Sequence, residues 1–216
     1  MRGLHHLEQS RSFRILWAME ELGLDYEVKY YQRQPNLSAP AALKQIDPLG
    51  KAPILVDQEQ VLAESAAILE YLQESYDEQQ QFRPQDATNK AQYRYWMHYA
   101  EGSLMPLLVM QLVMSTVPKR TPLLIRPVAK KICEGVKKQF VQRRLKDHIR
   151  FLESYLSEHD YFAGYFSFAD IQMSFPLEAM QSRTCQSYPA IQAYLKRVSQ
   201  RAAYARALAK EKQIAS

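Results

Sequence analysis

Cysteine is scarce in this sequence, and its scarcity excludes two kinds of protein. Only Cys133 and Cys185 occur among 216 residues, and they fit no paired disulfide framework. The motif Cys-x-x-Cys is absent, which excludes dithiol exchange. We therefore expect the protein to work in a reducing, cytoplasmic environment.

No pattern typical of a targeting or membrane-spanning segment is found in the sequence either. The N-terminal residues do not combine a basic start, an apolar run and a small-residue cleavage site. No uninterrupted apolar run approaches the roughly 20 residues that cross a bilayer. The composition, 47% hydrophobic and 24% charged, is ordinary for a soluble globular protein.

The sequence also lacks phosphate-binding loops and metal-binding clusters. It contains neither G-x-x-x-x-G-K-S/T nor G-x-G-x-x-G. His98, His148 and His159 do not have the spacing of metal ligands. His5 and His6 are adjacent on a predicted strand, so their side chains point to opposite faces and cannot chelate together. We therefore expect no bound metal.

Charge is distributed unevenly along the chain. Residues 1–80 hold 7 Lys and Arg against 13 Asp and Glu, a net charge of −6, whereas residues 81–216 hold 21 against 10, a net charge of +11. Such asymmetry indicates two domains. Residues 119–146 contain ten basic residues, but leucines and valines interrupt them at helical spacing, as on a solvated helix. We favour that interpretation over a nucleic-acid partner or an anionic membrane.

The N-terminal part alternates strand-like and helix-like segments, with strands predicted over 4–7, 26–31, 54–56 and 61–63 and helices from Ser12, over 39–46 and from Ser65. The order β-α-β-α-β-β-α predicts an α/β thioredoxin-like domain over residues 1–78. The polar segment 77–86 predicts a linker. Residues 87–216 predict an all-helical domain, with a break near Thr116–Pro122 and a kink at Pro106.

Ser10 lies between the first strand and the first helix. Its hydroxyl could cap that helix, which is the commoner role of a serine at a helix start. It could instead donate to an anion held near the positive end of the helix dipole. The sequence leaves both roles open, and it favours a structural role for Arg14 one turn later.

The segment Lys51-Ala52-Pro53 precedes a predicted strand. In a thioredoxin-like fold Pro53 would be cis and would expose the backbone of Ala52 to an extended ligand; the alternative is a trans proline at a strand edge. Lys51 could contact a ligand carboxylate or remain a solvated surface lysine.

Glu64 and Ser65 stand where the next helix begins. With Ser65 as N-cap, backbone N–H groups could bind a carboxylate while Glu64 binds an ammonium group, which suits the zwitterionic end of an amino acid. Capping alone would also explain Ser65. Farther on, Ser167 and Asp170 have the spacing of a capping box, which we assign to folding.

These residues resemble a known family. Residues 4–76, including the segments from Ser10 to Trp17, 48–53 and 63–65, are similar to the N-terminal domain of cytosolic glutathione transferases, and the helical remainder is similar to their C-terminal domain. The nearest resemblance is to a bacterial and fungal group related to the theta-like classes that use serine.

The resemblance implies an enzyme that activates the thiol of glutathione, its co-substrate, for attack on a small hydrophobic electrophile or a hydroperoxide. Ser10 would stabilise the thiolate. Lys51 would lie near the glycyl carboxylate, Ala52 beside Pro53 would pair with the cysteinyl unit, and Glu64 with Ser65 would hold the γ-glutamyl end. The alternative is a non-catalytic binding or regulatory protein on the same scaffold.

The resemblance also implies a pocket for the electrophile between the two domains. The residues expected to face it are Trp96, Tyr99, Ser103 and Leu107, although a stripe of this kind is more often core. A homodimer is implied too, in which each small domain faces the helical domain of the partner, and the opposite charges of the two halves suit that arrangement.

Overall fold

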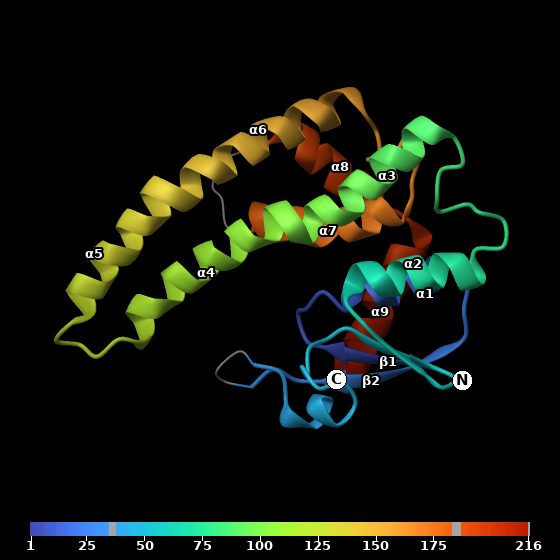
Figure 1. Ribbon diagram of the computed structural model, residues 1–216, viewed down its shortest axis with the longest axis horizontal. Coiled ribbons are helices and arrows are strands. Elements are labelled where there is room, and N and C mark those ends of the chain that lie inside the picture. Colours follow the sequence, from blue (N-terminus) through green and yellow to red (C-terminus); the bar gives the residue numbers. More distant parts are fainter. Residues whose placement is uncertain (35–37, 183–186, 216) are drawn as a thin grey trace.

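The computed structural model describes residues 1–34, 38–182 and 187–215, and it consists of a small sheet-containing part and a larger helical part (Figure 1). The strands are β1 (Arg2–Leu7), β2 (Tyr26–Tyr31), β3 (Ile54–Asp57) and β4 (Gln60–Ala63). The α-helices are α1 (Phe13–Glu21), α2 (Ser65–Tyr76), α3 (Ala87–Tyr99), α4 (Met105–Arg120), α5 (Arg126–Val136), α6 (Gln142–Glu158), α7 (Phe168–Gln181), α8 (Pro189–Ser199) and α9 (Ala202–Ala215). A 3₁₀ turn, η1 (Ala41–Gln45), and two π-helical turns, η2 (Ala100–Leu104) and η3 (Lys137–Val141), complete these elements.

The sheet has the strand order β2-β1-β3-β4. Strands β1 and β2 are parallel because helix α1 carries the chain back between them, whereas β3 is antiparallel to both of its neighbours. The predicted order of elements and the thioredoxin-like fold class are confirmed. The helix expected over 39–46 is the short 3₁₀ turn η1.

Helix α1 forms where the apolar residues follow a helical period. Ile15, Leu16 and Met19 are fully buried, and the chain leaves the helix at Gly23, whose φ of +63° suits a residue without a side chain. The buried face of α1 packs against α7 and α9. The first helix of the small domain is therefore held by the last helices of the chain.

Residues 87–120 form one long helix that contains the π-helical turn η2. Pro106 follows this turn and lacks the N–H that an α-helix would bond to the carbonyl four residues earlier, so the irregular turn accommodates it. The expected break near Thr116–Pro122 is present but begins at the end of that range, because α4 continues through Pro118 to Arg120. The chain turns only at Thr121, which is extended before Pro122.

By length and composition alone, this 34-residue helix could cross a membrane, with a mean hydropathy of 1.3 over its most apolar window. Polar residues interrupt its apolar runs, so no single apolar run of spanning length marks this helix in the sequence. Its first part, α3, packs against α7. Toward its other end, α4 and α5 form a hairpin that extends away from the rest of the molecule (Figure 1).

The two parts share one apolar core. Trp17 of α1 packs against Phe166 and Tyr204, with ring centroids 5.7 and 4.9 Å away. Helix α9 also contacts β2, so the C-terminal end of the chain returns to the sheet (Figure 1). The predicted limits 1–78 and 87–216 remain a prediction, and the segment between Tyr76 and Ala87 contains no helix or strand.

Candidate active site

Three predicted site segments meet at one end of the sheet. The strand register pairs His5 with Ile54 and Ile54 with Ala63. The end of β1, the start of β3 and the end of β4 therefore share an edge. Ser10 follows the first of these, Pro53 precedes the second and Glu64 follows the third. The fold thus brings together residues far apart in the sequence.

Ser10 is nearly buried in the connection between β1 and α1, with 6% of its surface exposed. Its Oγ accepts a hydrogen bond from the backbone N–H of Ser12 at 3.2 Å and lies 2.6 Å from Ser12 Oγ. Helix α1 begins at Phe13, with Ser12 in the N-cap position and no side-chain capping bond. The hydroxyl of Ser10 therefore does not bond to a helical N–H group, as simple capping would require.

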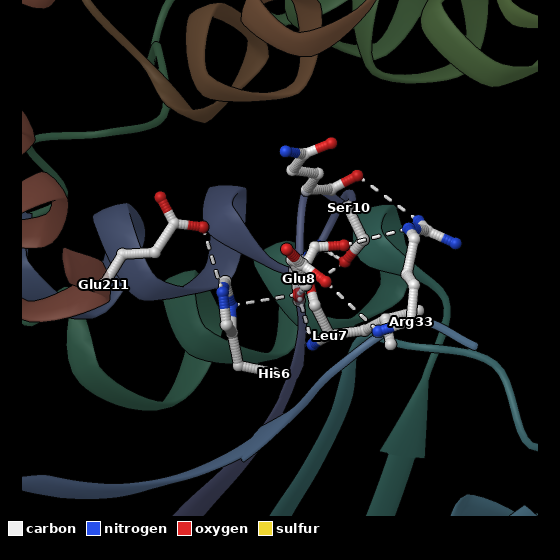
Figure 2. A network of polar contacts seen from close by, with 8 residues as sticks. His6, Leu7, Glu8, Ser10, Arg33 and Glu211 are labelled. Atoms are coloured by element: carbon white, nitrogen blue, oxygen red, sulfur yellow. Dashed lines mark hydrogen bonds and ion pairs between the residues drawn. The ribbon is translucent and has the colours of Figure 1, made fainter. Parts of the chain in front are cut away.

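Arg33 holds the same connection from outside. Its Nε donates to the carbonyl of Glu8 at 2.9 Å, and its guanidinium also donates to the carbonyl of Gln9 at 3.2 Å (Figure 2). Gln9 has a φ of 45°, which is uncommon for a residue other than glycine. These hydrogen bonds fix the turn that carries Ser10.

The peptide bond between Ala52 and Pro53 is cis, as predicted. Pro53 is buried at the start of β3, Ala52 is partly exposed and Lys51 is exposed. The Ala52 backbone thus lies at the sheet edge where an extended ligand could pair with it.

Glu64 and Ser65 begin helix α2 in a different way from the one expected. Glu64, not Ser65, occupies the N-cap position, and Ser65 is the first helical residue. Glu64 has a φ of 70°, a conformation that costs a side-chain-bearing residue on the order of 1–3 kcal/mol. Glu64 is exposed while Ser65 is buried. The free N–H groups of the first turn and an acidic side chain are thus adjacent.

Most of the residues expected to face the electrophile are buried in the structure. Trp96 is fully buried and packs on Phe162 with ring centroids 4.5 Å apart, and Leu107 is also buried. Tyr99 bonds through its hydroxyl to His148, and Ser103 lies in the π-helical turn η2. The helical stripe is therefore mainly core.

A cavity of about 510 Å³ adjoins the Ser10 turn instead. None of the four expected residues lines it. Its walls are Arg11 on one side and residues of η2 and α4 on the other: Glu101, Met105, Pro106, Val109, Met110, Val113 and Met114. The methionines of this wall are a signal that can be read in the sequence, since methionines are frequent at adaptable binding surfaces.

Arg14 connects the small domain to the helical part. It is fully buried, and its guanidinium contacts Glu101 at 2.7 Å and the side-chain oxygen of Gln172. Burial lowers the pKa of Arg14 to about 10, and Glu101 opposes that shift. Arg11 binds the other oxygen of Glu101 at 2.7 Å. The predicted structural role of Arg14 agrees with these contacts.

A hydrogen-bonded network behind Ser10 was not predicted. His6, fully buried on β1, joins Ser12 to Glu211 of α9 (Figure 2). His5 points to the other face of the sheet, where it bonds to Tyr31, so the predicted separation of the two histidines is confirmed. The signal for this network in the sequence is a histidine on the core-facing side of a strand. Its partner Glu211 lies 205 residues farther along the sequence, so no local pattern connects the two. Among the described residues no cluster of His, Cys, Asp or Glu could hold a metal ion.

Comparisons with known proteins agree with this geometry. Residues 1–74 match the family model of the glutathione S-transferase N-terminal domain, and residues 125–211 match that of the C-terminal domain. The fold and these two matches define a protein of the glutathione S-transferase class.

Individual relatives extend this result over the whole chain. Glutathione S-transferase 3 of Schizosaccharomyces pombe is 38% identical over 82% of this chain and 74% of its own length. Glutathione S-transferase 1 of Saccharomyces cerevisiae is 33% identical over 99% of this chain and 96% of its own. A glutathione S-transferase structure from Actinobacillus pleuropneumoniae, at 33% identity, superposes with a TM-score of 0.81 over 97% of this chain and 92% of its own. The chain belongs to the glutathione S-transferase family and, by homology, is a glutathione transferase.

Proposed function

We propose that this chain joins glutathione to small hydrophobic electrophiles by using Ser10 to stabilise the glutathione thiolate, as in the serine-using group of the family. The observation that carries the proposal is the shared sheet edge, where Ser10, the cis Pro53 and the start of α2 converge. A sphingomonad glutathione S-transferase structure of the same fold, with a TM-score of 0.70, is a complex with glutathione. We place the reaction in the cytoplasm.

Each part of the tripeptide has a matching group at this edge. The backbone of Ala52 would pair with the cysteinyl unit as an added strand does. Glu64 would bind the γ-glutamyl ammonium group, and the first-turn N–H groups at Ser65 would bind its carboxylate. Lys51, exposed beside them, would meet the glycyl carboxylate. The sulfur would then lie near Ser10.

The required stabilisation matches what the site can supply. A free thiol has a pKa of about 8.5, and lowering it by about two units takes roughly 2.7 kcal/mol. A hydrogen bond to a charged group contributes about 1.5–3 kcal/mol, and the positive end of a helix adds roughly 0.3–1 kcal/mol. Ser10 and the start of α1 together are therefore sufficient.

We place the second substrate in the cavity lined by Arg11 and Met110, and no longer beside Trp96 and the other three residues expected from the sequence. Its methionine-rich wall suits an apolar electrophile. A hydroperoxide bound there would be reduced by the same thiolate: one glutathione attacks the peroxide oxygen and releases an alcohol, and a second glutathione yields the disulfide and water. This peroxidase activity is part of the proposal.

The test is a spectroscopic titration of bound glutathione thiolate in wild type and in Ser10→Ala. We expect the apparent pKa of the bound thiol to rise by about one to two units in the variant, since the hydrogen bond to the sulfur is lost. Ser199→Ala, which removes a hydroxyl at the end of α8, serves as the matched control. Equal titration curves in wild type and Ser10→Ala would remove Ser10 from the mechanism.

A further inference from the structure

A continuous chain of hydrogen bonds runs from Ser10 to the C-terminal helix. Ser10 Oγ lies 2.6 Å from Ser12 Oγ, which lies 3.0 Å from His6 Nδ1. His6 Nε2 lies 3.0 Å from Glu211 Oε1 (Figure 2). The Ser10 hydroxyl, which carries the proposed function, is therefore connected through Ser12 and His6 to the carboxylate of Glu211 in α9.

This hydrogen-bonded chain is shielded from water over most of its length. Ser12 and His6 are fully buried and Ser10 is 6% exposed, whereas the Glu211 side chain is 24% exposed at the far end. Tyr30 of β2 stacks on the His6 ring at 5.9 Å between centroids. Because these groups are buried and bond to one another, the position of each proton follows from that of its neighbour.

In one arrangement of protons, the hydroxyl proton of Ser10 points away from the ligand. When His6 is neutral and carries its proton on Nε2, that proton is donated to Glu211 and Nδ1 is an acceptor. Ser12 then donates its hydroxyl proton to His6. Ser12 Oγ accepts from the Leu7 N–H at 3.1 Å and from the hydroxyl of Ser10, whose proton is thereby used inside the protein.

The opposite arrangement frees the Ser10 proton for the sulfur. When His6 Nδ1 carries a proton, it donates to Ser12 Oγ, which turns its own proton toward Ser10. Ser10 Oγ then accepts from both the hydroxyl and the backbone N–H of Ser12. Its own proton then has no partner among Ser12, His6 and Glu211 and can bond to a thiolate. The competing acceptor for Ser12, the carbonyl of Leu7, is farther away at 3.3 Å.

We propose that His6, held by Glu211, takes up the proton of the glutathione thiol through the hydroxyls of Ser10 and Ser12. The thiol passes its proton to Ser10 Oγ, Ser10 passes its own to Ser12 Oγ, and Ser12 passes its own to His6 Nδ1. The products are a thiolate, an imidazolium and two intact hydroxyls, so protons and charge balance. The transfer converts the first arrangement into the second, which leaves Ser10 donating to the sulfur.

Glu211 and Tyr30 face the His6 ring, which becomes the imidazolium in this transfer. Glu211 accepts from Nε2 on the side of α9, and the neutral ring of Tyr30 covers the side of β2. Burial, followed by the charges of Glu8 and Glu211, raises the pKa of Tyr30, so this phenol stays neutral. His6 and Glu211 are thus positioning residues that act through Ser12 and Ser10, and their role rests on the proposed function.

The test compares His6→Phe with His5→Phe. His6→Phe keeps a buried ring and removes both nitrogens. His5→Phe is the same substitution on the opposite face of β1, where His5 bonds to Tyr31 and takes no part in the bonds between Ser10, Ser12, His6 and Glu211. We expect His6→Phe to raise the apparent pKa of the bound glutathione thiol by about one unit and to lower kcat about ten-fold at neutral pH. KM for glutathione should stay within about two-fold, because the binding groups are untouched. His5→Phe should match wild type in all three.

Glu211→Gln provides a second, milder variant near the exposed end of the chain. The amide of the new glutamine can donate to His6 Nε2, which keeps His6 neutral with its proton on Nδ1. Nδ1 can then no longer accept the proton of the thiol, but it still donates to Ser12, so the Ser10 hydroxyl keeps its orientation. We expect an intermediate loss, on the order of three-fold in kcat, that changes the pH profile. If His6→Phe does not fold, this variant decides the question, and an unchanged pH profile then overturns the proposal.

The outcomes separate the two proposals. If wild type forms no thiolate, or Ser10→Ala titrates as wild type does, the proposed function fails. If Ser10→Ala loses the thiolate while folded His6→Phe keeps the wild-type titration and kcat, the hydrogen-bonded chain is structural and this inference is wrong.

Discussion

Asp170 is a residue whose chemistry serves folding. It is fully buried at the start of α7, where its carboxyl group accepts hydrogen bonds from the backbone N–H groups of Phe162 and Ser167 and from the hydroxyl of Tyr194. The structure confirms the predicted capping box between Ser167 and Asp170. One side chain thus fixes a helix start and the loop before it.

The burial of Asp170 predicts a measurable pH dependence of stability. Burial raises its pKa from 3.8 to about 6, so the folded chain binds this proton more tightly than the unfolded chain does. Its contribution to stability is fully present below about pH 4 and is lost as the pH rises through about 6. The free energy of unfolding of wild type minus that of Asp170→Asn, which does not titrate, should therefore fall by up to about 3 kcal/mol over this range. Urea unfolding at a series of pH values measures it, and a constant difference would contradict the assignment.

The candidate site shows which residues a sequence can identify. Ser10, Pro53 and Glu64 were identified because each stands at the end of a strand or the start of a helix, and local patterns mark those positions. The cavity wall at Arg11 and Met110 was missed because helical periodicity shows that a side chain is inward but not which neighbour it meets. Trp96 satisfied the pattern and lies in the core.

At the scale of elements, helix α9 joins the end of the chain to its beginning. Tyr204 packs edge-on against Phe13 and Trp17, with ring centroids 5.3 and 4.9 Å away, and its hydroxyl bonds to Glu178 at 3.3 Å. Arg206 donates to the side chain and carbonyl of Glu20. Helix α9 therefore covers α1 with both apolar and charged contacts.

The apolar contacts should dominate this attachment. Tyr204→Ala removes a ring from between two aromatic neighbours and should lower the free energy of unfolding by about 3 kcal/mol. Tyr204→Phe keeps the ring and loses one hydrogen bond, so it should cost only about 1 kcal/mol. Denaturant unfolding of both variants measures the difference. Equal losses would show that α9 is held by its polar contacts instead.

The elements also show why some of the fold was predictable. The strands, α1 and α2 follow local apolar periods, and their order alone indicates the thioredoxin-like fold. The break between α4 and α5 was expected near Thr116–Pro122 and begins only at the end of that range, because the helix continues through Pro118 to Arg120. The approach of Glu211 to His6 depends on how α9 returns to the sheet, which no local pattern encodes.

At the scale of the whole molecule, charge and exposed apolar surface suggest self-association. The acidic N-terminal part carries a net charge of −6 and the remainder carries +11. The α4–α5 hairpin leaves large apolar side chains in solvent, among them Val113, Leu124 and Ile132, which are 44%, 95% and 62% exposed. A single copy thus has two parts of opposite net charge and exposed apolar surface, which a second copy could match and cover.

We predict a homodimer in which the small domain of each copy faces the helical domain of the other. Light scattering across a wide concentration range should give twice the mass of 25.2 kDa. Since opposite charges would meet across this contact, raising the ionic strength from about 0.05 M to about 1 M should shift the equilibrium toward monomer, because the screening length falls from over 10 Å to about 3 Å. A monomer mass at every concentration would contradict the dimer. A dimer that is indifferent to salt would show that the exposed apolar residues, rather than the opposite charges, hold the copies together.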